Sequence, residues 1–375
     1  MKILGYISGF DGCGLFRLQL PFKYLNKKPN VVAKISFVYD KLDIEWADIV
    51  IVQKQYQDSV IPYVKMAQES GKKVVLEYDD LMSDIPAWNK ASEFYGNKKD
   101  QVVNFIRLSD ACTVTTDYLK QYHVLDNPNI HVLPNSMDIP QVDGFKSLAL
   151  PDLYKYTTVK DPKSLKSEKQ QNIPLRDALD KMKGRLKIMW WGSATHEEDL
   201  HIIDRTLAKL CKHHPEIIIV KIGCCTDAFL DYMEPYLDQL VIVNKALVHH
   251  FHQVLYSVAS TGPSISVCPI VDIPFNRAKS NLKVIESWAV GAAVVVSNVE
   301  NYAKTVTNGV DGLVASNDVE GGIADDWYEK LSFLITQPEE RDALAKAGAL
   351  TVRSHYNIEK NADMWLDVYD QVLRG

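Results

Sequence analysis

The sequence has 375 residues, of which 46% are hydrophobic and 24% are charged, and its formal net charge is −6 at pH 7. This length is typical of two domains with a core each, and the composition excludes a disordered chain. The negative balance disfavours a general affinity for nucleic acid, because such binding depends on a basic surface.

Short β-branched runs alternate with amphipathic stretches over residues 1–140. The predicted strands are residues 2–7, 31–38, 48–52, 73–77, 111–115 and 130–133. This alternation is typical of βα units around a parallel sheet. We therefore predict a doubly wound, Rossmann-like domain over residues 1–140.

Residues 141–185 interrupt this rhythm, because they are rich in lysine and proline and have no sustained apolar period. We predict a linker or insertion there. A second βα series predicts another Rossmann-like domain over residues 186–355. Its strands are expected at residues 186–191, 217–222, 240–243, 264–268, 293–297 and 312–315. Apolar residues at helical spacing predict a final helix within residues 356–375.

A glycine-rich loop follows the first predicted strand, with Gly12 and Gly14 just before Arg17. The glycine spacing does not match a dinucleotide-binding fingerprint. The loop is a candidate for close backbone approach to a ligand, and Arg17 for a cation that faces it. The alternative interpretation is that Arg17 is a surface residue.

Two carboxylates, Asp79 and Asp80, follow the predicted strand at residues 73–77. Open α/β sheets bind ligands at the carboxyl ends of their strands, so this pair is a candidate to orient or deprotonate a hydroxyl group of a ligand. The alternatives are a helix cap and a Mg²⁺ site.

A small-residue turn follows the predicted strand at residues 186–191. Gly192 and Ser193 permit close backbone approach to a ligand, and Thr195 is suited to cap the next helix and to donate to a phosphate. The alternative is an ordinary turn with an exposed His196.

The segment 274–286 is the richest in candidate ligand contacts. It reads as a loop and a helix that begins near Lys279. Ser280, Lys283 and the first amides of this helix would favour a phosphate, and Glu286 would reach the ribose of a bound nucleotide. The alternative is an amphipathic helix with an exposed polar face.

The string Phe-Asn-x-x-Lys-Ser-x-Leu-Lys-x-x-Glu at residues 275–286 resembles the donor-binding signature of glycosyltransferase family 4. The resemblance implies that Glu286 holds the nucleotide ribose and that Asn276 and Leu282 belong to the donor site. Ala278 stands where the better-known form of the signature has a second glutamate. The sugar-side contact is therefore left to Asn276, Lys279 or Asp272.

Three further segments resemble the same family. Residues 192–199 match Gly-Ser-x-x-His-x-x-Asp, residues 12–17 match Gly-x-Gly-x-x-Arg, and residues 134–138 match a Pro-Asn turn with Ser136 in place of glycine. The resemblance implies the GT-B architecture, in which two Rossmann-like domains face a central cleft and the last helix crosses back to the first domain.

The implied activity is that of a retaining hexosyl- or pentosyltransferase. A nucleoside-diphosphate sugar would be the co-substrate, with no further cofactor and no metal ion. The candidate catalytic residues are Arg17, Asp79, Asp80 and Lys279. The acceptor would be a hydroxyl of a glycan or lipid-linked glycan, with a modified DNA base as the alternative. A catalytically silent nucleotide-sugar-binding protein and a GT-B sugar epimerase are the competing functions.

The six cysteines are scattered and lack the paired spacing of zinc or redox sites, although Cys224 and Cys225 are adjacent. They are typical of buried thiols in a reducing compartment. The sequence shows neither a signal peptide nor a run of 18 apolar residues, so we expect a cytoplasmic protein.

Overall fold

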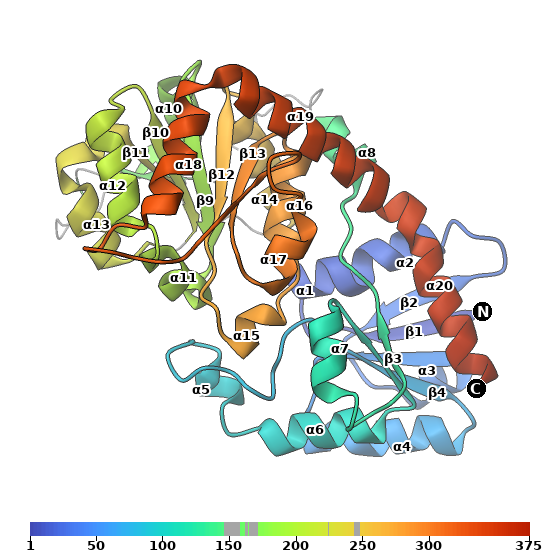
Figure 1. Cartoon of the computed structure of the whole chain (residues 1–375). Helices are drawn as coiled ribbons and strands as arrows, with labels where there is room; N and C mark the ends of the chain where they lie inside the picture. The colour runs from blue at the N-terminus through green and yellow to red at the C-terminus, as the bar shows by residue number, and fades with distance from the viewer. Residues whose placement is uncertain (146–157, 162–163, 165–171, 224, 244–247) are drawn as a thin grey trace. The chain divides into compact units, whose positions relative to one another are not determined.

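The computed structural model describes residues 1–145, 158–161, 164, 172–223, 225–243 and 248–375 (Figure 1). They form two compact units, whose positions relative to one another are not determined. Unit 1 contains residues 1–138, 273–282 and 355–375, and unit 2 contains residues 139–272 and 283–354.

Unit 1 is built on a parallel sheet, whose six strands among the described residues lie in the order β2-β1-β3-β4-β5-β6. The strands are β1 (Lys2–Tyr6), β2 (Val32–Ser36), β3 (Ile49–Gln53), β4 (Lys73–Glu77), β5 (Ala111–Val114) and β6 (Ile130–Val132). The helices are α1 (Gly12–Gly14), α2 (Leu20–Leu25), α3 (Lys41–Trp46), α4 (Ile61–Glu69), α5 (Ser92–Tyr95), α6 (Lys99–Leu108), α7 (Asp117–His123), α15 (Pro274–Arg277) and α20 (Ile358–Arg374). A turn of π-helix at Leu15–Gln19 joins α1 to α2.

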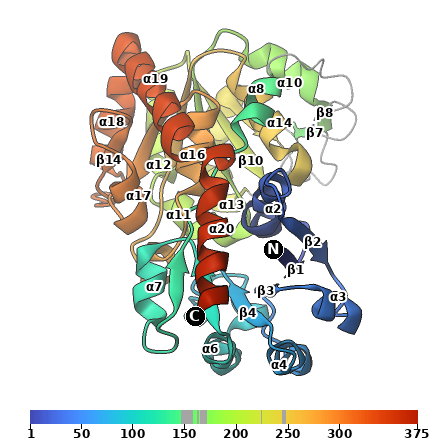
Figure 2. The same cartoon turned by 90° about the vertical axis from the view of Figure 1, so that its right-hand side faces the viewer.

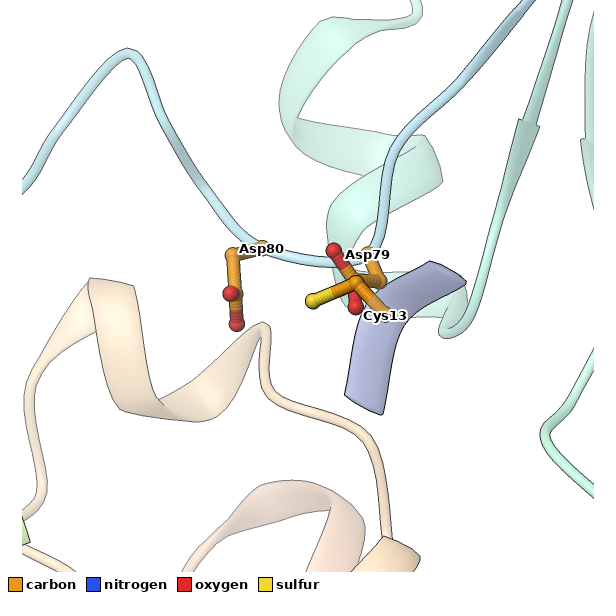
Figure 3. A group of neighbouring side chains, drawn as sticks. All are labelled: Cys13, Asp79 and Asp80. Carbon is orange, nitrogen blue, oxygen red and sulfur yellow. The ribbon is translucent and has the colours of Figure 1, made fainter. Parts of the chain in front are cut away.

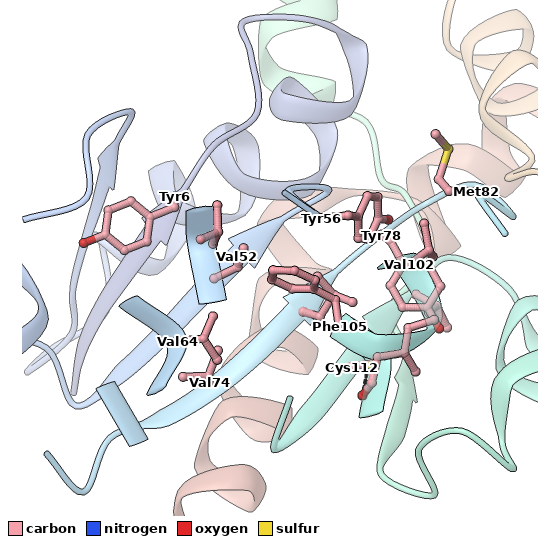
Figure 4. Close-up of a cluster of buried hydrophobic side chains, with 14 of the residues drawn as sticks. Tyr6, Val52, Tyr56, Val64, Val74, Tyr78, Met82, Val102, Phe105 and Cys112 are labelled. Carbon is pink, nitrogen blue, oxygen red and sulfur yellow. Dashed lines mark hydrogen bonds between the residues drawn. The ribbon is translucent and has the colours of Figure 1, made fainter. Parts of the chain in front are cut away.

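The two faces of the unit 1 sheet are both covered by helices. Alternate strand residues such as Val52 and Val74 pack with Phe105 of α6 in one core (Figure 4). The other face is covered by α2 and α20, which lie side by side (Figure 2). Gly5 of β1 permits this packing, because a side-chain carbon there would lie 2.8 Å from the ring of Phe22.

Unit 2 contains a larger mixed sheet in the order β14-β13-β12-β9-β10-β11-β7-β8, eight strands among the described residues. The strands are β7 (Thr158–Lys160), β8 (Asn172–Pro174), β9 (Lys187–Gly192), β10 (Ile218–Gly223), β11 (Leu240–Val243), β12 (Ser264–Cys268), β13 (Ala293–Ser297) and β14 (Leu313–Ala315). The helices are α8 (Ile139–Gly144), α10 (Leu175–Met182), α11 (Glu197–His201), α12 (Asp204–His213), α13 (Asp227–Met233), α14 (Val248–Ala259), α16 (Leu282–Ala289), α17 (Glu300–Thr305), α18 (Asp325–Thr336) and α19 (Pro338–His355).

Strand β9 shows why this sheet needs helices on both faces. Ile188 and Trp190 point into a core shared with α12, α13 and α18, whereas Met189 and Trp191 point into a core shared with α10 and α14. This alternation has the two-residue period of a strand that is buried on both sides. The two units therefore confirm the predicted α/β fold of two doubly wound domains.

Two expectations for the chain's organisation need correction. The stretch predicted as a linker or insertion contributes β7 and β8, which pair antiparallel at the edge of the unit 2 sheet, and α10, which is buried in its core. The rest of that stretch, residues 146–157, 162–163 and 165–171, lies outside the described residues, as does Cys224.

Segment 273–282 also differs from the expectation, because it belongs to unit 1 although it lies within the predicted C-terminal domain. The helix expected to begin near Lys279 is α16, which begins at Leu282, and the loop expected before it contains the short helix α15. Among the described residues, no helix combines the length and apolar character that a membrane span requires.

Candidate functional site

The loop after β9 lies at the point of the unit 2 sheet where strand order reverses, between β9 and β12. This is the position at which open α/β sheets bind ligands. Gly192 is required there, because a side-chain carbon would lie 2.7 Å from the ring of Trp190. The hydroxyl groups of Ser193 and Thr195 lie 2.8 Å apart on the exposed part of the loop.

Asp199 holds this loop in place. Its carboxylate is buried and accepts a hydrogen bond from Nδ1 of His196 at 2.7 Å and another from the backbone amide of Val271 at 2.9 Å. Burial raises the pKa of Asp199, but the hydrogen bond and charge of His196, with Lys283 nearby, outweigh it and hold the pKa below its usual value. Asp199 therefore ties the loop after β9 to the loop after β12.

Glu286 lies on α16, buried between two hydrogen-bond donors. The indole nitrogen of Trp191 donates to Oε2 at 2.9 Å, and Nε2 of His252 lies 2.9 Å from Oε1. The imidazole is the donor of this second bond, since an ionised carboxylate only accepts. Three elements, β9, α14 and α16, thus fix one carboxylate within unit 2.

The sequence did not point to Trp191 or His252 as partners of Glu286. His252 lies in a histidine-rich stretch without a recognised motif, and its contact with Glu286 spans 34 positions of sequence. Lys283, one turn before Glu286, is largely buried, and its Nζ lies 5.1 Å from the centre of the Trp190 ring. Lys283, Glu286 and the loop with His196 therefore belong to the same unit.

The earlier part of the predicted donor motif packs into unit 1. Ala278 is fully buried in the core of that unit, and its carbonyl accepts a hydrogen bond from Thr116. This burial explains the alanine, because a glutamate would place a charge in an apolar core. Asn276 is buried as well, and the hydroxyl of Ser280 accepts a hydrogen bond from Asn135 at 3.1 Å.

Two carboxylates and a thiol lie together at the carboxyl edge of the unit 1 sheet (Figure 3). Asp79 and Asp80 follow β4, and Cys13 lies in α1, the short helix that follows β1. Lys54, directly after β3, places its Nζ 3.0 Å from Oδ1 of Asp79, 3.4 Å from Oδ2 of Asp80 and 3.4 Å from the sulfur of Cys13. Lys279 lies on the far side of Asp80, with Nζ 3.8 Å from Oδ1.

The sequence predicted Asp79, Asp80 and Lys279 but not Lys54. A single lysine after a strand carries no motif, and only the topology brings it between the two aspartates. The order β2-β1-β3 places the reversal point of the unit 1 sheet between β1 and β3, next to this cluster.

The role predicted for Arg17 is corrected by its surroundings. Its guanidinium is completely buried and forms two hydrogen bonds with the carboxylate of Glu77, at 2.6 and 3.2 Å, under the ring of Trp365. It also donates to the carbonyl of Leu133 and the side chain of Asn135. Arg17 is therefore a structural residue of the unit 1 core, neither an exposed cation nor a surface residue.

Of the two glycines before Arg17, Gly14 is required by its surroundings and Gly12 is not. At Gly14 a side-chain carbon would lie 2.1 Å from the carbonyl oxygen of Gly9, whereas at Gly12 it would meet nothing. Asp11 caps the start of α1 by accepting from the amide of Gly14 at 2.8 Å.

Comparison with known proteins connects these features to a family. Residues 242–367 match the family model described as glycosyl transferase-like. N,N'-diacetylbacillosaminyl-diphospho-undecaprenol alpha-1,3-N-acetylgalactosaminyltransferase of Campylobacter jejuni is 29% identical over 38% of this chain and 35% of its own length. D-inositol 3-phosphate glycosyltransferase of Streptosporangium roseum is 33% identical over 26% of this chain and 21% of its own length. The matches thus span about a third or less of these curated relatives.

The fold comparison covers nearly the whole chain. The structure of Anabaena HepE in complex with UDP-glucose superposes with a TM-score of 0.64 at 12% identity, over 99% of this chain and 100% of that one. The chain therefore has the GT-B fold, and residues 242–367 are similar to the glycosyl transferase-like family.

The part of this GT-B chain that matches the family model contains His252, Lys279 and Glu286. The loop with Gly192 and His196 precedes the matched part, as does the cluster around Lys54. The family match therefore bears on only part of the candidate site, and the remaining residues are assigned from geometry.

Proposed function

We propose that this GT-B chain is a retaining, metal-independent glycosyltransferase that takes a sugar from a nucleoside-diphosphate sugar. The observation that carries the proposal is the carboxylate of Glu286, fixed by Trp191 and His252 near the reversal point of the unit 2 sheet. A preorganised carboxylate is suited to accept hydrogen bonds from the two hydroxyl groups of a ribose.

The diphosphate would be held by the loop at residues 192–196 and by Lys283. Charge builds on the leaving phosphate during transfer, and fixed cations and backbone amides stabilise it without reorganising. HepE is described in complex with UDP-glucose, so UDP-hexoses are the first donors to test.

The acceptor we propose is a lipid-linked glycan. The Campylobacter relative is named for transfer to a diphospho-undecaprenol-linked sugar, which makes this class a better starting point than a modified DNA base. Such a substrate is consistent with action at the cytoplasmic side of a membrane.

Titration calorimetry with UDP tests the donor site. Glu286→Ala should weaken binding by about tenfold to a hundredfold, because it removes charge-assisted hydrogen bonds to the ribose. Glu329→Ala, an exposed change on α18 of the same unit, is the control and should bind like the wild type. Glu286→Gln keeps an acceptor oxygen for Trp191 or His252. It therefore tests whether weaker UDP binding comes from the lost carboxylate or from misfolding.

Equal affinity of folded Glu286→Ala and wild type would contradict the donor assignment. Turnover is tested with UDP-sugars and a panel of lipid-linked acceptors, with the anomeric configuration of the product determined by NMR. Donor binding without transfer or donor hydrolysis would instead identify a silent nucleotide-sugar-binding protein.

A further inference from the structure

Two segments of unit 1, the short helix α1 and the loop after β4, bring negatively polarised atoms together at the carboxyl edge of its sheet (Figure 3). Cys13 Sγ and one carboxylate oxygen from each of Asp79 and Asp80 all lie within 4.8 Å of one another. Sulfur and oxygen atoms at such distances resemble the ligand set of a divalent cation. The cluster lies beside the reversal point of the sheet.

An ammonium group already occupies this position. Nζ of Lys54 lies 3.0 to 3.4 Å from an atom of each of the three side chains. The backbone of Lys54 has a φ of 49°, in the left-handed region that residues other than glycine and asparagine rarely adopt. Such a conformation persists only where the surrounding structure enforces it, and it is most common at functional sites.

The groups around Lys54 stabilise its positive charge. Burial disfavours the ammonium, but Asp79, Cys13 and Asp80 outweigh this effect and raise the pKa of Lys54 well above its usual value. The side chain is therefore a permanent cation at physiological pH.

The cluster extends to Lys279. Asp80 presents Oδ2 to Lys54 and Oδ1 to Lys279, whose ammonium also lies 4.8 Å from the centre of the Phe275 ring. Asp80 thus lies between two ammonium groups, an arrangement that suits a residue that orients Lys279 better than one that removes a proton.

We propose that Lys54 is a built-in cation that takes the place of a divalent metal among Cys13, Asp79 and Asp80, and that it orients Lys279 through Asp80. Lys54 is a positioning residue, and its effect on transfer rests on the proposed function. Its place in the cluster does not depend on that function.

Replacing Lys54 should convert the cluster into a metal site. In the 375-residue chain, Lys54→Ala removes the ammonium group that the thiol and the two carboxylates share, and Cd²⁺ is the probe because a thiolate is a soft ligand. We expect a cadmium–thiolate absorption band in Lys54→Ala that is absent from the wild type and is removed by adding Cys13→Ser. Lys65→Ala, an exposed change on α4, should bind no more Cd²⁺ than the wild type.

Kinetics give a second measurement. Lys54→Ala should lower kcat by at least tenfold with little change in the KM for the donor, Lys54→Arg should restore part of the loss, and EDTA should not affect the wild type. A folded Lys54→Ala that binds no Cd²⁺ at Cys13 would overturn the proposal. Lys54→Met, which retains most of the aliphatic stem, replaces the alanine variant if that variant does not fold.

The wild type tests the proposal even if neither variant folds. A cadmium–thiolate band in the wild type that Cys13→Ser removes would show that Lys54 does not fill the position, and would overturn the proposal. If the UDP-binding experiments contradicted the donor site, these Cd²⁺-binding results would be unchanged. The two proposals can therefore be refuted independently.

Discussion

A single guanidinium connects distant parts of unit 1. Arg17 contacts Glu77 at the end of β4, the residues after β6 and the ring of Trp365 on α20. Both charges of the Arg17–Glu77 pair are fully buried, so each depends on the other for compensation.

We predict that Arg17→Met destabilises unit 1 by about 3 to 5 kcal/mol, because it leaves the carboxylate of Glu77 buried without a cation. The double variant Arg17→Met/Glu77→Gln should recover part of this loss. Chemical denaturation followed by fluorescence measures both changes. Arg107→Met, which breaks an exposed ion pair with Asp126, should cost less than about 1 kcal/mol. Equal losses from Arg17→Met and Arg107→Met would contradict the structural role.

The residue types of the candidate site could be predicted from sequence, but many of their partners could not. Glu286, Lys279 and Asp80 stand in recognisable strings, whereas Lys54 and His252 acquire their neighbours only through the fold. For Arg17 the predicted role itself was wrong. Its position after a glycine-rich loop suggested a contact with a ligand and did not indicate its burial beneath α20.

Helix α11 and the loops beside it depend on one carboxylate. Asp199 accepts hydrogen bonds from His196 and Val271, which lie in loops that follow two neighbouring strands. The amide of asparagine offers a single acceptor oxygen and no charge, so in Asp199→Asn only one of the two donors keeps its present acceptor and the charge-assisted bond with His196 is lost.

We predict that Asp199→Asn lowers the free energy of unfolding by about 1.5 to 3 kcal/mol at neutral pH. Because the pKa of Asp199 is lowered in the folded chain, its carboxylate stabilises the fold above about pH 4, and this contribution is lost as the pH falls through the lower folded-state pKa. The difference between the two proteins should therefore shrink in acid.

Denaturation at a series of pH values measures this difference. Glu198→Gln, a change at an exposed neighbour on α11, is the matched control, and its free energy of unfolding should hardly differ from that of the wild type. A difference between Asp199→Asn and wild type that stayed constant from pH 7 to pH 3 would argue against the ionised carboxylate as its cause.

Most helices and strands could be predicted from the periodicity of their hydrophobic residues. The strand expected at residues 48–52 is β3, and the final amphipathic pattern is α20. Helix α10 was missed, although Leu175, Ala178, Leu179 and Met182 are buried at helical spacing, because Pro174 and the lysines around it suggested a loop. The antiparallel strands β7 and β8 are too short to show a period.

At the scale of the whole molecule, unit 1 is completed by the end of the chain. Helix α20 buries Ala362, Trp365 and Tyr369 in that unit, and the backbone of Met137 pairs with Tyr356 and Ile358. We predict that removal of residues 355–375 unfolds unit 1 while unit 2 stays folded.

Hydrogen exchange followed by mass spectrometry distinguishes the units. The amides of β1, β3 and β4 should lose protection in the truncated protein, and those of β9 and β10 should keep it. Trp365→Ala is a milder test, with an expected cost of about 3 to 5 kcal/mol. Unchanged protection of β1 in the truncated chain would refute this dependence.

The assignment of residues 273–282 to unit 1 limits how homologues can exchange parts. A hybrid joined only after Asp138 would combine the first 138 residues of one parent with the Phe275 and Ala278 of another, although these side chains belong in the same core. A viable chimera therefore needs three pieces from one parent, residues 1–138, 273–282 and 355–375. Natural recombination at one crossover would break this match, so the two units are expected to share a common evolutionary history.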